Sequence, residues 1–195
     1  MAEPGPGLTA PAGGEIRAGL YLRMSRARRI AGRVALVLVA ASAFARFAPG
    51  FDAFAACFFA GVLVALAAVD LERHILPNRI LLPATAALTA AELIAAPGDG
   101  ARRLIWAAGT FAVVLALALA YPAGLGMGDV KLAFFLGLGL GGSVILAFLL
   151  GTVAAGLFGL GVIARYGRAG GKVALPLGPF LVGGALVALF ALGPR

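Results

Sequence analysis

Cysteine and histidine are nearly absent from this chain, and each shortage excludes a class of function. The single cysteine, Cys57, permits no intrachain disulfide and no CxxC zinc site. The single histidine, His74, excludes a histidine-rich zinc site, and the sequence has no GxSxG motif of a serine hydrolase. Cys57 lies inside an apolar run with no base nearby, so we expect a buried, inert thiol. We therefore expect no metal and no cofactor.

Charge is also scarce, and apolar residues take its place. Only 12% of the 195 residues are charged, against about a quarter in a soluble domain, and 62% are hydrophobic. Nearly all of residues 34–193 is apolar, with short polar or Gly/Pro-rich breaks. This predicts an all-α membrane protein with several spans. The candidate spans are 34–48, 53–70, 79–96, 104–121, 130–142, 143–164 and 174–193.

The number of spans depends on two weak segments. Segment 34–48 contains Arg46 and is the weakest candidate. Segment 130–142 is short, and the run Gly141-Gly142-Ser143 after it predicts a tight hairpin into the next span. We expect seven transmembrane helices, or six as the alternative.

The net charge of +8 suggests nucleic-acid binding at first sight. The basic residues flank apolar runs and do not form one basic face with interleaved aromatics, so we expect no nucleic-acid partner. Residues 1–33 carry no apolar span, are rich in Pro and Gly at their start and end with several arginines. They predict a disordered cytoplasmic tail before a transmembrane domain over 34–195.

The distribution of Lys and Arg predicts the orientation of the spans. With the N-terminus inside, twelve of the sixteen basic residues fall on the cytoplasmic side. Arg102 and Arg103 are exceptions on the outer side. This orientation places both polar stretches DLERHILPN (70–78) and GLGMGDVK (124–131) at the cytoplasmic face.

Three acidic residues lie in or at the ends of the predicted spans: Asp70, Glu92 and Asp129. An acid at membrane depth costs roughly 2.5–3.5 kcal/mol on insertion scales, so each is a candidate for function. We expect Glu92 to make a polar contact between helices or to lie near the outer interface. Asp70 and Asp129 fall on one face at similar depth. Taken singly, each could simply mark a helix end, and Asp129 could be an N-cap.

Two neighbouring carboxylates have a specific chemistry. Like charges a few ångströms apart do not both ionise cheaply, so one keeps a proton while the other is charged. The charged group can take a proton from a water between them, and the protonated group can donate to a carbonyl oxygen. The pair titrates as a unit, so acid and base are not assigned separately. Asp70 and Asp129 therefore predict aspartyl peptide hydrolysis.

The motifs around both aspartates resemble those of the type IV prepilin peptidase family, membrane aspartyl proteases of the GxGD type. The first aspartate of that family corresponds to Asp70, with Leu76, Pro77 and Asn78 completing its motif. The second corresponds to Asp129, preceded by Gly126 and Gly128 and followed by Lys131. The run ALPLGPFLVGGAL (174–186) resembles the family's last span, and the likeness covers about 53–193.

The resemblance implies an endopeptidase of the inner membrane that removes the basic leader of prepilin-like proteins on the cytoplasmic side. Larger members also methylate the new N-terminus and carry an insert with paired CxxC motifs. With one cysteine, this chain resembles the short, peptidase-only form, as in Tad/Flp pilus or archaeal preflagellin systems. Prepilin-like substrates and membrane lipids are the implied partners, and the oligomeric state stays open.

The other motif residues have physical roles that the sequence suggests. Glycines near Asp129 allow a close backbone approach to substrate and a positive φ. Pro77 ends the preceding helix, and Asn78 is a candidate cap for the next. Lys131 either lowers the pKa of Asp129 or binds lipid phosphate, and the lipid role is slightly favoured.

Two other functions use the same residues. A small ion-coupled transporter would use Asp70 and Asp129 as a proton relay. A GxGD protease of the presenilin kind, which cuts within spans, has Tyr-Asp at its first site, whereas this chain has Val69-Asp70. His74 is expected to be a loop or headgroup residue.

Overall fold

The computed structural model describes residues 38–39, 41–42, 45–46, 50–73, 75–122, 125–167 and 177–193. Its elements are α3 (Phe51–Arg73), α4 (Asn78–Ala95), α5 (Pro97–Ala120), α6 (Met127–Leu140), the 3₁₀ turn η1 (Gly141–Ser143), α7 (Val144–Tyr166) and α8 (Gly178–Leu192). Within these residues every regular element is helical, which confirms the all-α prediction. The predictions for residues 1–33 and His74 fall outside the described residues, as do the first residues of the runs 124–131 and 174–186.

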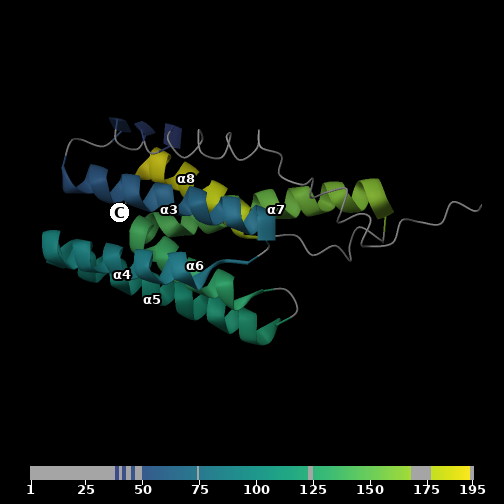
Figure 1. The fold of residues 1–195 in the computed structure, drawn as a ribbon. Coiled ribbons are helices and arrows are strands. Elements are labelled where there is room, and N and C mark those ends of the chain that lie inside the picture. The colour runs from purple at the N-terminus through teal and green to yellow at the C-terminus, as the bar shows by residue number, and fades with distance from the viewer. Residues whose placement is uncertain are drawn as a thin grey trace, which may run out of the picture.

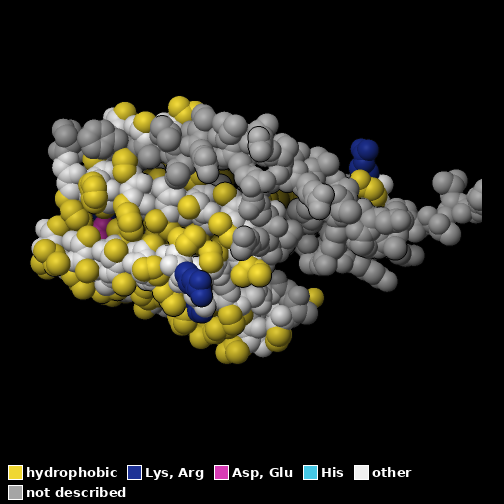
Figure 2. Space-filling view, in the orientation of Figure 1, with side chains coloured by type: hydrophobic (Ala, Val, Ile, Leu, Met, Phe, Trp, Pro, Cys, Tyr) yellow, Lys and Arg dark blue, Asp and Glu magenta, His cyan; other side chains and the backbone are white. Residues whose placement is uncertain are grey.

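Among the described residues, three helical runs are long and apolar enough to cross a membrane. They are Phe51–Leu71, Pro97–Ala120 and Met127–Tyr166, and Gly178–Leu192 is apolar but shorter. Hydrophobic side chains are spread over much of the described part of the face seen in Figure 2. This is the character of a membrane protein. Six to seven spans remain a prediction.

The run Met127–Tyr166 is interrupted at the predicted glycine break. Gly141 has φ 54°, in the left-handed region that favours glycine, and is the first residue of the 3₁₀ turn η1. The helices on either side then take different partners: α6 packs mainly on α5, and α7 mainly on α8. The break is therefore where it was predicted, but the two helices make few contacts with each other, so they do not pack as a tight hairpin.

Small residues allow close approaches between helices at Gly137 and at Gly151. A Cβ on Gly137 would lie 2.6 Å from the Cα of Ala107, so α5 and α6 meet there backbone to backbone. A Cβ on Gly184 would lie 2.7 Å from the backbone nitrogen of Gly151, which brings α7 and α8 equally close. Such small-residue contacts are how helices pack tightly in lipid.

Glu92 makes the predicted polar contact between helices. Its carboxylate accepts a hydrogen bond from Arg103, and both side chains are buried in a salt bridge that joins α4 to α5. Arg103 is therefore not a loop cation, which accounts for one exception to the charge bias. Glu92 lies in the last turn of α4 and Arg103 near the start of α5, so the pair lies near the α4–α5 turn, at the opposite end of α4 from Asn78.

Successive helices run in opposite directions, so the end of one helix lies at the same end of the bundle as the start of the next (Figure 1). The end of α3 and the starts of α4, α6 and α8 come together at one end of the bundle. Both polar stretches singled out from the sequence lie at this end.

Candidate active site

The two motifs, more than fifty positions apart, contact each other directly. The Nζ of Lys131 in α6 donates a hydrogen bond to the Oδ1 of Asn78 in α4, at 3.0 Å. A Cβ on Gly128 would lie 3.2 Å from the Cβ of Leu76, just before α4. The residues that follow Asp70 in the chain therefore pack against the turn of helix that carries Asp129.

Asp70 lies in the last turn of α3, buried with 7% of its surface exposed. The start of α8 faces its carboxylate. A Cβ on Gly178 would clash with Oδ2 and lie 3.2 Å from Cγ. Glycine at 178 therefore leaves the room that the Asp70 carboxylate occupies.

Asp129 lies in the first turn of α6, three residues after the N-cap, Gly126. The backbone N–H of Gly126 donates to Oδ2 of Asp129 at 3.3 Å, and the N–H of Asp129 donates to the Gly126 carbonyl at 3.0 Å. The bond that the Asp129 side chain accepts is one half of a capping box, and glycine has no side chain for the other half. It restrains the carboxylate at the helix start. Asp129 is half-buried, so one side of it is still accessible.

The start of α8 lies beside both aspartates. Leu177 lines the same cavity as Asp129, and the next residue, Gly178, packs on Asp70. Leu177 and Gly178 thus connect the surroundings of two aspartates that are 59 positions apart in sequence.

Three expectations about the surrounding residues are wrong in detail. Gly126 is extended, with φ −88°, and Gly128 is helical, so neither needs a positive φ. Gly128 is small because Leu76 packs against it. Asn78 is the first residue of α4 and Pro77 its N-cap, so the Asn78 side chain bonds Lys131 rather than capping the helix. Lys131 hydrogen-bonds Asn78 and not Asp129. The binding of lipid phosphate by Lys131 stays a prediction.

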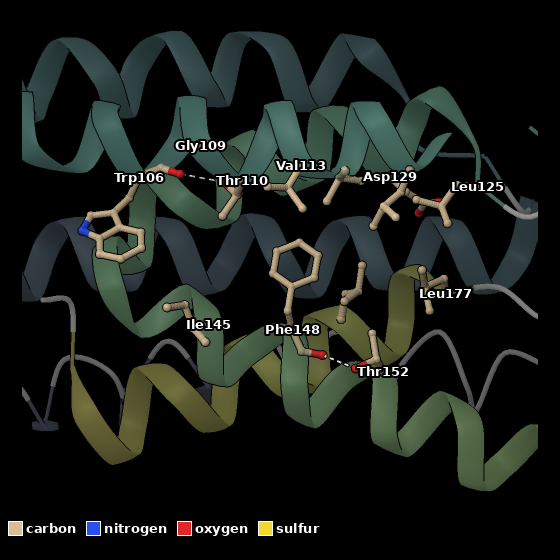
Figure 3. A pocket seen from close by; sticks show the side chains of 13 residues that line it. Trp106, Gly109, Thr110, Val113, Leu125, Asp129, Ile145, Phe148, Thr152 and Leu177 are labelled. Atoms are coloured by element: carbon tan, nitrogen blue, oxygen red, sulfur yellow. Dashed lines mark hydrogen bonds between the residues drawn. The ribbon is translucent and has the colours of Figure 1, made fainter. Parts of the chain in front are cut away.

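Sequence reasoning missed a long apolar cavity beside Asp129. Its volume is about 510 Å³, and α5 and α7 form its two walls (Figure 3). Asp129, Leu125 and Leu177 close one end, and Trp106 and Ile145 lie toward the other. Hydropathy gives no signal for such a cavity, because residues that face it and residues that face lipid are equally apolar. Gly178 could have been found from the sequence, because it lies in the run 174–186, which resembles the family's last span.

Comparison with known proteins identifies the family. The model of the type IV leader peptidase family matches residues 57–160, more than half of the chain. The chain belongs to this family. The part of the chain that the leader peptidase model matches includes both aspartates, Asn78 and Lys131. Gly178 lies beyond it.

The names of curated relatives agree with this family assignment. The prepilin leader peptidase/N-methyltransferase of Bacillus subtilis (strain 168) is 30% identical over 149 residues, which are 76% of this chain and 60% of that protein. The protein of the same name from Aeromonas salmonicida (strain A449) is 30% identical over 147 residues, 72% of this chain and 50% of that protein. The chain thus spans about half to three fifths of the length of these relatives. No solved structure gives a significant match.

Proposed function

We propose that this protein is an aspartic endopeptidase of the membrane, which removes the basic leader peptide from type IV prepilin-like proteins. The observation that carries the proposal is the contact between the two motifs, Leu76 with Gly128 and Asn78 with Lys131. It gathers Asp70 and Asp129 at the start of α8. Family membership and the printed activity of the relatives support the same reaction.

In the proposed mechanism the two carboxyl groups share one proton. The charged carboxylate takes a proton from water as the water oxygen bonds to the carbonyl carbon of the scissile peptide. The protonated carboxyl donates its proton to the carbonyl oxygen. As the resulting tetrahedral diol collapses and its C–N bond breaks, the protonated carboxyl gives its proton to the leaving nitrogen. One diol hydroxyl gives its proton to the charged carboxylate, so the pair again holds one proton. The groups act as a unit, so neither is named as the acid.

The proposed reaction takes place at the cytoplasmic face of the inner membrane. The positive-inside bias supports this face, and it is stronger once Arg103 is counted as half of a buried ion pair. We propose further that the chain carries no N-methyltransferase activity, unlike the named activity of its relatives. The single cysteine, Cys57, supports this, because paired CxxC motifs are impossible in the chain.

The test is cleavage of a co-expressed prepilin-like protein by Asp70→Asn and Asp129→Asn variants. Each replacement keeps the side-chain volume and removes the exchangeable carboxyl proton, so we expect cleavage to be abolished while the protein still accumulates in membranes. Mass spectrometry of the product N-terminus reads the cleavage position and the absence of an added methyl group in one measurement.

The matched control is Asp99→Asn. Asp99 is an exposed acid in the first turn of α5, paired with Arg102 at the other end of the bundle. Its replacement leaves cleavage unchanged. Full cleavage by either site variant contradicts the two-aspartate mechanism, and gradient-driven ion flux without cleavage in proteoliposomes would favour a transporter.

A further inference from the structure

The helix that carries Asp129 meets α5 along one row of its residues. Ala133 and Gly137 follow Asp129 at intervals of four, so the three residues lie one above the other on the same side of α6. A Cβ on Gly137 would lie 2.5 Å from the Oγ1 of Thr110 and 2.6 Å from the Cα of Ala107. The missing side chain at Gly137 therefore lets α5 approach the row of α6 that begins at Asp129.

Thr110 of α5 makes a hydrogen bond across this contact. Its hydroxyl lies 3.1 Å from the carbonyl oxygen of Ala133, one turn along α6 from Asp129. The same hydroxyl lies 2.9 Å from the carbonyl oxygen of Trp106 and 3.1 Å from that of Ala107, both in its own helix (Figure 3). One hydroxyl proton is thus shared among three acceptors, and one of the three belongs to α6.

The bond from Thr110 to Ala133 differs from the usual behaviour of a helical threonine. A threonine hydroxyl in a helix commonly bonds a carbonyl three or four residues before it in the same helix. Thr152 of α7 lines the same cavity as Thr110 and Thr85 lies in α4, and the bonds seen for both stay within their own helices (Figure 3). Thr110 makes this local bond too, but it also ties α5 to α6.

Near Asp129, α6 is held on two sides. Residues two apart on a helix point to nearly opposite sides. On one side Lys131 bonds Asn78 of α4, and on the other Ala133 accepts from Thr110 of α5. The two bonds together oppose a rotation of α6 about its axis. Side chains reach about 5–6 Å from a helix axis, so a rotation of about 10° moves a carboxylate by about 1 Å.

We infer that Thr110 is a positioning residue, whose hydroxyl fixes the rotation of α6 through the Ala133 carbonyl and so sets the direction of the Asp129 carboxylate. This inference rests on the proposed peptidase function. Thr110 acts through α6 and takes no part in proton transfer. A misdirected carboxylate slows the chemical step and leaves the binding of substrate as it was, so the effect falls on kcat and not on KM.

Thr110→Val tests the inference, because valine keeps the shape of threonine and has a methyl group in place of the hydroxyl. We expect kcat for a prepilin-like substrate to fall about tenfold with KM unchanged, a smaller loss than the roughly hundredfold that a full ångström of misplacement can cause. The measurement is steady-state cleavage by the purified full chain in detergent.

Serine and alanine at the same position give a second comparison that differs by the hydroxyl alone. Thr110→Ser keeps the donor, and we expect it to retain the wild-type kcat. Thr110→Ala loses the donor, and we expect the same fall in kcat as for Thr110→Val. This pair also carries the test if Thr110→Val does not accumulate, because neither replacement adds an atom. A rate that follows the hydroxyl, and not the size of the side chain, supports positioning.

Thr152→Val and Thr85→Val are the matched controls, because each loses a hydroxyl whose bonds stay within its own helix. We expect both to keep the wild-type kcat. A wild-type kcat for Thr110→Val, or an equal loss of kcat in Thr110→Ser or in either control, overturns the inference while the peptidase function stands. A rise in KM with kcat unchanged also overturns it. If the wild type cleaves no prepilin-like protein, the function and the inference both fail.

Discussion

At the residue scale, the candidate site depends on small residues that leave space for its carboxylates. Gly178 faces Asp70, and Gly128 faces Leu76. Neither position needs a left-handed backbone, since each glycine lies in a helix with an ordinary φ. The requirement is the absence of a side chain, so even alanine is too large where the neighbouring atoms cannot move.

The first prediction concerns Gly178→Ala. Its methyl group would overlap the Asp70 carboxylate, so that carboxylate must shift by about an ångström, and a misplacement of that size can cost about a hundredfold in rate. We expect prepilin cleavage to fall by about this factor while the protein accumulates normally. The measurement is kcat on purified protein in detergent.

Gly183→Ala on the same helix is its control. A Cβ there meets open space, so the rate stays at the wild-type level. Equal rates for both alanine variants would show that Asp70 does not need its present position.

At the element scale, the buried ion pair fastens α4 to α5. Glu92 is 1% exposed, and the pair leaves Oε2 of Glu92 and Nε of Arg103 with no hydrogen-bond partner among the described residues. A buried pair with unsatisfied atoms gains less from its attraction than it loses in desolvation. Removing only one partner of the ion pair is costly, because the other partner then remains as a lone buried charge.

The second prediction follows from that asymmetry. Arg103→Met should lower the free energy of unfolding by about 3–5 kcal/mol, because the Glu92 carboxylate is left unpaired. Adding Glu92→Leu removes the stranded charge and restores stability to about the wild-type level or above it. Thermal unfolding in detergent micelles measures both variants.

Arg102→Met is the matched control, since Arg102 forms an exposed pair with Asp99. We expect a change within about 0.5 kcal/mol. If the double variant is as unstable as Arg103→Met alone, a role beyond simple pairing must be assigned to Glu92.

At the scale of the whole molecule, alternating helix directions separate the two kinds of polar residue. The proposed catalytic pair lies at one end, and the ion pair lies toward the other (Figure 1). The apolar cavity runs from the first end along α5 and α7 (Figure 3). The candidate aspartates and this cavity thus occupy adjoining parts of one bundle.

The third prediction concerns orientation. In a Cys57→Ala background, Met127→Cys places a thiol at the start of α6, where Met127 is 56% exposed. Gly98→Cys places one in the exposed first turn of α5, at the other end. An impermeant maleimide should label Met127→Cys only in inverted vesicles and Gly98→Cys only in intact cells. The reverse pattern contradicts a cytoplasmic active site.

Much of this architecture is predictable from local sequence. Apolar runs and their breaks determine where the helices lie, since a helix in lipid must bond its own backbone and cover itself with apolar side chains. The Gly141 break and a polar partner for Glu92 followed from residue types alone. Asp70 and Asp129 stood out because an acid is costly at membrane depth.

Which residues meet was decided only by the tertiary structure. Hydropathy records that a side chain avoids water, but it does not distinguish a helix neighbour from lipid or from a groove. The bond between Lys131 and Asn78, the space that Gly178 leaves for Asp70, and the cavity between α5 and α7 all depend on packing between distant segments. The sequence by itself determined the helices and the two acids, and their packing decided that those acids share one end beside an apolar groove.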